Sequence, residues 1–206
     1  MPNIEQRPQG PLAMAVLALL HEEPMHPYQI SYTMRARHWD WCIKLKFGSL
    51  YHTVEALIRD GLIQPVETAR DGRRPERTVY AVTDHGRQEF LERLSDMVRV
   101  PVRDYTDFAA GLKFIWRLDA AVAVELLRDR AKSLGLEVEH LRQVIRMLRV
   151  EKRLRRLSHI ELEHAEAMAR AEIGWIKALA DEIESGKLEW KAGHLEPAEM
   201  ELKEAR

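Results

Sequence analysis

KFGSLYHTVEALIRDGLI, residues 46–63, has the pattern of a short amphipathic helix that ends at a glycine. Leu50, Val54 and Leu57 recur at the spacing of one helical face. Gly61 stands where a glycine in the left-handed conformation commonly follows a helix. The stretch therefore predicts a helix that buries one side in a core and leaves the other side to be explained.

The opposite side of this helix offers small and polar groups. Short polar residues at a helix N-terminus let backbone amides approach a phosphate, while tyrosine and histidine can donate to phosphate oxygens or reach base edges. An ordinary surface helix whose polar face meets only water is the alternative. The residues predicted to contact bases or phosphates are Ser49, Tyr51, His52 and Thr53, preceded by Lys46 for phosphate.

Two helices are expected before this one. Pro11 suits the first position of a helix that continues to Leu20, and Pro24 prevents its extension. The apolar run over residues 12–20 is too short to span a bilayer, so we expect a core helix. A second helix is expected over residues 27–38, with Tyr28, Ile30 and Met34 as candidate inward residues.

A β-hairpin is expected after the helix, because the apolar period changes to two over residues 63–68 and again over residues 78–82. Asp71-Gly72 between them is a turn signal. The hairpin tip carries a local excess of positive charge that can reach sugar-phosphate or a minor groove, although many charge runs are simply solvated. The candidate phosphate contacts there are Arg70, Arg73, Arg74 and Arg77.

A fourth helix is expected to begin at a cap formed by Thr83 or Asp84. Its apolar stripe comprises Phe90, Leu91, Leu94, Met97 and Val98. Three helices, a hairpin and a helix follow one another in the order of a winged helix-turn-helix. The sequence thus predicts a mainly α fold with one β-hairpin.

The C-terminal half is expected to be helical throughout. Pro101 interrupts the pattern and marks a boundary, after which apolar residues alternate in steps of three and four over residues 124–148. Such a seam requires a partner helix, from a second protomer or from the same chain. We predict a DNA-binding domain over residues 1–100, a helical dimerisation and effector domain over residues 101–190, and a charged tail over residues 191–206.

Composition limits the other functions. The formal net charge is −1, so the chain as a whole is not basic. The single cysteine, Cys42, excludes an internal disulfide, and this suits a cytoplasmic protein. The chain lacks a glycine-rich phosphate loop, a nucleophile elbow and a Cys-x-x-Cys motif, so we predict neither an enzyme nor a cofactor. Two Glu-x-x-His pairs, at Glu137–His140 and Glu161–His164, lie off the apolar stripes and favour surface pairing over metal binding.

Aromatic residues could also stack on a flat ligand, although packing in a core is the favoured explanation. The candidate effector-binding residues are Trp39, Trp41, Phe108, Trp116 and Trp175.

Three segments together resemble a known family. MHPYQI at residues 25–30, the stretch at residues 46–63 and DGRRPERTVYAVTDHGRQEF at residues 71–90 look like the PadR family of transcriptional regulators, including its Gly-Ser-Leu-Tyr and Thr-x-x-Gly motifs. The resemblance covers residues 12–95 closely. It implies a homodimer, assembled through C-terminal helices, that binds an inverted-repeat operator in double-stranded DNA. It also implies repression, relieved in some members by a small aromatic or cationic effector.

The prediction is therefore a homodimeric winged-helix regulator of transcription. The alternative is a protein-interaction module in which the winged helix contacts another polypeptide and the helical arm provides oligomerisation.

Overall fold

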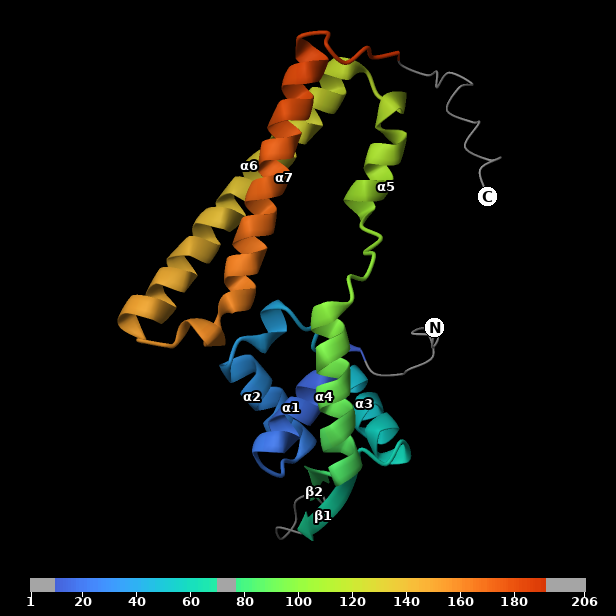
Figure 1. Ribbon diagram of the computed structural model, residues 1–206, viewed down its shortest axis with the longest axis vertical. Helices are drawn as coiled ribbons and strands as arrows, with labels where there is room; N and C mark the ends of the chain where they lie inside the picture. The colour runs from blue at the N-terminus through green and yellow to red at the C-terminus, as the bar shows by residue number, and fades with distance from the viewer. Residues whose placement is uncertain (1–9, 70–76, 192–206) are drawn as a thin grey trace, which may run out of the picture. The chain divides into compact units, whose positions relative to one another are not determined.

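The computed structural model describes residues 10–69 and 77–191. The chain divides into two compact units, residues 1–103 and 104–206. Figure 1 shows the helices and strands of each unit. The predicted division into a DNA-binding domain, an effector domain and a tail is a statement about function, and it stays a prediction.

The sequence explains how the first two helices of this unit begin. Pro11 and Pro27 occupy the first positions of α1 and α2, and the side chain of His26 forms a capping box with Gln29. Arg37 donates to both carboxylate oxygens of Glu22, at 2.5 and 2.7 Å, and thereby ties α2 to α1. The helices are α1 (Pro11–Glu22), α2 (Pro27–Ala36), the 3₁₀ turn η2 (Trp39–Trp41) and α3 (Phe47–Arg59).

An antiparallel hairpin follows, formed by β1 (Ile63–Ala69) and β2 (Arg77–Val82). The register shifts between Pro65 and Glu67, which leaves Val66 unpaired and half exposed. Proline has no N–H to donate to the ladder, so a bulge at this point is expected. Residues 70–76 at the tip lie outside the described residues.

Helix α4 (Asp84–Arg99) completes the first unit. The side chain of Thr83 accepts from the Gly86 amide, which confirms Thr83 as the cap. Leu62 lies beneath this turn: its carbonyl accepts from the Thr83 amide at 3.0 Å, and a Cβ added at Gly86 would lie 2.0 Å from that oxygen. The first turn of α4 therefore lies so close to Leu62 that only glycine fits at position 86.

The first core gathers apolar residues from every helix and from the hairpin. Ile30 and Met34 are fully buried as predicted, but the inward position predicted for Tyr28 is wrong, because its side chain is 61% exposed. Helix α2 buries Pro27, Ile30, Ser31 and Met34, a stripe that Tyr28 does not share.

The apolar stripe predicted for α4 is only partly buried. Phe90 packs against the first core, but the residues beyond it are between 41% and 81% exposed. Periodicity located an apolar face here without showing that the unit covers it. The exposed residues are Leu91, Leu94, Met97 and Val98.

The second unit is a helical hairpin with shorter elements. Helices α6 and α7 lie side by side (Figure 1). The predicted seam is buried between them, so the partner helix of α6 belongs to the same chain. The elements are α5 (Asp107–Phe114), the 3₁₀ turn η3 (Ile115–Arg117), α6 (Ala120–Arg146), the π-turn η4 (Met147–Glu151), the 3₁₀ turn η5 (Arg156–Ser158) and α7 (Ile160–Glu184).

Ion pairs hold α6 and α7 in register along their length. Arg128 pairs with Glu184 at 2.5 Å near one end, and Arg142 pairs with Glu166 at 2.9 Å towards the other. At the connecting turn Glu163 accepts from Arg149 and Arg156, and these hydrogen bonds, that of Arg156 first, lower the pKa of Glu163 below its ordinary value.

Within residues 10–69 and 77–191, no helix is both long enough and apolar enough to cross a membrane.

Candidate nucleic-acid interface

Helix α3 presents two different faces. Leu50, Val54 and Leu57 are buried in the first core. Ser49 is exposed, and the side chain of His52 is 84% exposed, so both project from the unit. The helix is therefore anchored by its apolar face and offers a polar one to solvent.

The N-terminus of α3 is open to an incoming group. Lys46 is the N-cap residue and provides no side-chain cap, and its own side chain is exposed. The first amides of a helix point outward along the axis and carry partial positive charge, so they can bind an anion. A phosphate could occupy this position without displacing a capping side chain.

Gly48 lies in this first turn, and nothing in the described chain requires a glycine there. A Cβ added at Gly48 would meet no described atom within 4 Å. Glycine weakens a helix by up to about 1 kcal/mol relative to alanine, and the open space at Gly48 leaves room for a partner to approach the backbone closely. Gly86 differs, because the fold itself excludes a side chain there.

Acidic side chains lie close to His52 and Arg59 on the polar face. His52 Nδ1 lies 3.5 Å from the Glu55 carboxylate, and Arg59 pairs with Asp60 at 3.4 Å. Thr53 is half buried and its hydroxyl donates to the Ser49 carbonyl at 2.7 Å. Thr53 therefore has its hydroxyl hydrogen engaged within the helix, and it is less exposed than Ser49 and His52.

Sequence reasoning missed several exposed groups on the segments that precede α3. Ile43 and Leu45 pack against the first core, which leaves Lys44 exposed next to Lys46. The alternation of apolar and basic residues over 43–46 was the available signal. On α2 the side chains of Tyr28 and Tyr32 are also exposed, one helical turn apart.

The basic hairpin tip falls largely outside the described residues. Arg70, Arg73 and Arg74 lie there, and Arg77 begins β2 but its side chain is not described. Their role in phosphate contact therefore stays a prediction, as do the predicted contacts of Tyr51 and the other α3 residues.

The predicted effector aromatics fall into separate groups. Trp39 packs against the first core and Trp41 is half exposed in the same unit. In the second unit the rings of Phe108 and Trp175 meet edge to face, with centroids 6.4 Å apart. Phe108 and Trp175 are thus in ring contact within the second unit.

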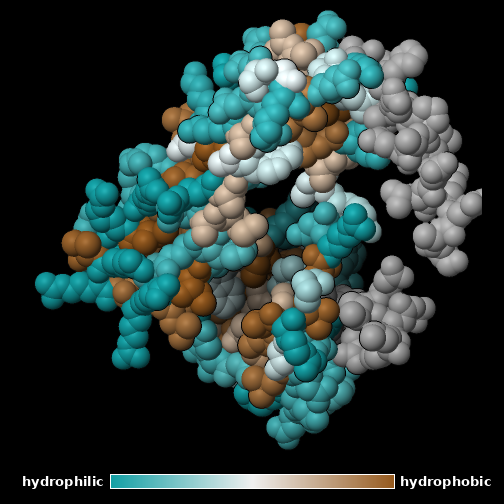
Figure 2. Space-filling model, turned by 45° about the horizontal axis from the view of Figure 1, so that its top comes forward, coloured by the Kyte–Doolittle hydropathy of each residue, from teal (hydrophilic) through white to brown (hydrophobic). Residues whose placement is uncertain are grey.

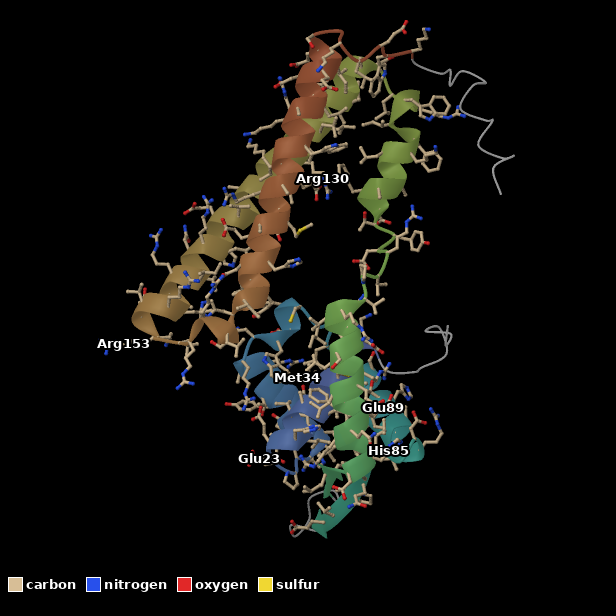
Figure 3. All side chains as sticks on the ribbon, in the orientation of Figure 1. Glu23, Met34, His85, Glu89, Arg130 and Arg153 are labelled. Carbon is tan, nitrogen blue, oxygen red and sulfur yellow. The ribbon has the colours of Figure 1, made fainter. Side chains whose placement is uncertain are left out.

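The Phe108 ring is already covered from within the chain. The guanidinium carbon of Arg130, which Figure 3 labels, lies 3.8 Å from the centre of this ring. Arg130 also pairs with Glu172 at 2.5 Å. A cationic ligand would have to displace Arg130. The Trp116 ring has a different neighbour, Arg117, whose guanidinium carbon lies 4.5 Å from the centre of the ring.

The Glu-x-x-His pairs do not form a metal centre in the described part of the chain, where no three His, Cys, Asp or Glu side chains gather to hold an ion. The side chains concerned are exposed: Glu137, His140, Glu161 and His164.

The first unit, with its exposed third helix followed by a hairpin and a fourth helix, is a winged helix-turn-helix. Comparison with protein-family models identifies its family. Residues 16–92 match the transcriptional regulator PadR-like family, and this segment belongs to that family. A family of transcriptional regulators agrees with the prediction that the chain is not an enzyme.

Solved structures share the fold. Bacillus subtilis PadR in complex with operator DNA is 21% identical, covering 84% of this chain and 98% of that one, with a TM-score of 0.66. The same protein in complex with p-coumaric acid is 19% identical, and the match covers 84% of this chain and 98% of that one, with a TM-score of 0.67. The PadR-like regulator BC1756 from Bacillus cereus is 21% identical over 88% and 99%, with a TM-score of 0.54. A comparison with curated protein sequences found no match.

Proposed function

We propose that the protein is a cytoplasmic regulator that binds double-stranded DNA through α3 and the wing. The observation that carries this proposal is the exposed polar face of α3, whose N-terminus is uncapped and whose Gly48 is open to close approach. Ser49, Tyr51, His52 and Thr53 are the proposed contacts to bases or phosphates. Lys46 and the wing arginines are the proposed phosphate contacts, joined by Lys44.

We further propose that it acts as a homodimer and represses transcription. An inverted-repeat operator matches a two-fold dimer whose recognition helices enter successive major grooves, about 34 Å apart. The exposed apolar face of α4, from Leu91 to Val98, supports an assembly because such faces are commonly covered by a partner. Sedimentation equilibrium is expected to give twice the chain mass of 24.0 kDa, and a single-chain mass would contradict the dimer.

DNA binding is tested first by gel shift. The duplex upstream of the protein's own reading frame, at a stated salt concentration, is expected to shift at lower protein concentration than a scrambled duplex of equal length. Equal affinity for both would contradict sequence-specific regulation. No shift with either would favour the alternative, a module that uses the winged helix to bind another polypeptide.

The wing is tested by the dependence of affinity on salt. Removing one phosphate contact should reduce the slope of log K against log salt by about 0.9 for duplex DNA. The double variant Arg73→Ala/Arg74→Ala is therefore expected to have a shallower slope. Lys113→Ala/Lys187→Ala, which removes two exposed charges from the second unit, is the matched control. An equal slope in wild type and wing variant would contradict the wing contacts.

We also propose that a small aromatic or cationic effector releases the DNA. Bacillus subtilis PadR has been crystallised with p-coumaric acid, which supports testing aromatic compounds. Trp41 and Trp175 are both about half exposed, so a stacked ligand should change tryptophan fluorescence. Unchanged fluorescence across phenolic and cationic aromatics, with the protein–DNA complex intact in their presence, would contradict the effector.

A further inference from the structure

A groove runs between α6 and α7 in the second unit. It has a volume of about 670 Å³, within the range of small-molecule sites, and its lining residues all come from these two helices. The helices lie side by side (Figure 1). None of the predicted effector aromatics lines the groove.

The floor of the groove is apolar and kept open by small residues. Ala131, Gly135 and Val138 contribute from α6, and Ile173 and Ile176 contribute from α7. A Cβ added at Gly135 would meet no described atom within 4 Å, so this helix position faces free space. The floor can therefore receive an apolar body without rearrangement of the helices.

The lining holds five basic residues and one acidic residue. Arg128, Arg142 and Arg170 already pair with glutamates. Lys132 and Lys177 are exposed, and no ion pair to either is found within the described residues.

The register of the helices brings these two lysines together. The antiparallel pairs Arg128–Glu184 and Arg142–Glu166 place Lys132 and Lys177 at about the same level on opposite sides. The acidic lining residue Asp181 lies one turn beyond Lys177. Two lysines thus line one stretch of apolar floor from opposite helices.

We propose that this groove binds an amphipathic organic anion, with its apolar body on the floor and its carboxylate or sulfonate between Lys132 and Lys177. Charge complementarity favours this occupant over a second copy of the chain. A two-fold axis through the groove would set its basic residues against the same residues of the second copy, which is electrostatically unfavourable. The inference concerns binding alone and does not depend on DNA recognition.

The test compares two fluorescent probes that differ in charge. 8-Anilinonaphthalene-1-sulfonate is the anion, and N-phenyl-1-naphthylamine is its uncharged analogue. The full-length double variant Lys132→Gln/Lys177→Gln should bind the sulfonate about tenfold more weakly while its affinity for the amine is unchanged, because removing two exposed charges costs about 1.4 kcal/mol. Lys113→Gln/Lys187→Gln, with the same charge change elsewhere in the unit, should bind both probes as wild type does.

A second variant tests the location independently of charge. Gly135→Leu fills the floor and should abolish saturable binding of both probes, whereas Gly174→Leu, at an open glycine outside the groove, should not. Thermal melting by circular dichroism identifies any variant that fails to fold. If Gly135→Leu fails to fold, the lysine variant still decides the test, because both lysines are exposed and their replacement should leave the fold intact. Sulfonate binding unchanged in both groove variants, or equal loss of both probes in the lysine variant, would overturn the proposal. A change of sedimentation mass in Gly135→Leu would also overturn it, since the groove would then be an interface between copies.

Discussion

Replacing Gly86 with alanine is expected to destabilise the winged-helix unit by about 3 kcal/mol or more, because the new Cβ would overlap backbone atoms that cannot rotate away. The added carbon would lie 2.0 Å from the Leu62 carbonyl oxygen and 3.0 Å from Val82 Cγ2. Relief requires moving the first turn of α4 off Leu62. That movement would break the hydrogen bonds from Thr83 to the carbonyls of Gly61 and Leu62.

Thermal unfolding followed by circular dichroism is the measurement. For a unit of roughly 100 residues the loss corresponds to a melting temperature lower by roughly 12–24 °C. Gly174→Ala, at an open helical glycine of the second unit, is the control and should keep the wild-type melting temperature or raise it. A wild-type melting temperature for Gly86→Ala would contradict the close approach of α4 to Leu62.

The Thr83–Gly86 junction illustrates what sequence could and could not predict. Capping preferences identified Thr83 or Asp84 as the start of α4, since the donors of a first helical turn need a local acceptor. The reason for Gly86 was not available, because the obstructing carbonyl belongs to Leu62, 24 positions earlier in the chain. Local chemistry was predictable and the distant contact was not.

The apolar stripes show the same limit. Spacing correctly located the buried faces of α3 and α6, and the buried residues Ile30 and Met34 of α2. It left open whether α6 pairs within the chain and what covers the α4 stripe beyond Phe90, and it wrongly predicted an inward Tyr28. An apolar period shows which face a helix would bury, but it does not show what lies opposite (Figure 2 shows hydrophobic side chains among the surface atoms).

The candidate site divides in a similar way. The helical spacing of α3 predicted that Ser49 and His52 face solvent, because residues away from the buried apolar face of a helix must lie at the surface. It could not assign Gly48, because a glycine on a polar face has no meaning until the space around its Cα is known. Likewise, aromatic composition gave no means of predicting that Phe108 is covered by Arg130.

Gly48→Ala is expected to weaken DNA binding about 10- to 100-fold while leaving the unit as stable as wild type or more stable. The weaker binding corresponds to one or two displaced hydrogen bonds between first-turn amides and phosphate, each worth about 1–1.5 kcal/mol. Stability should not fall, because the new methyl group meets no described atom within 4 Å and alanine favours the helix. A substitution that merely disturbs the fold would be expected to lower both the DNA affinity and the stability.

Affinity is measured by fluorescence anisotropy on the duplex that gives the strongest gel shift, and stability is measured by thermal melting of the same samples. Gly111→Ala is the matched control, since Gly111 is also an open glycine in a short helix but lies in the second unit. It should retain wild-type affinity. Wild-type affinity for Gly48→Ala would show that no phosphate or base approaches this turn closely, and contact through α3 would then have to depend on longer side chains such as Tyr51 and His52. A fall in both affinity and melting temperature would show instead that Gly48 serves the fold, contrary to the open space around it.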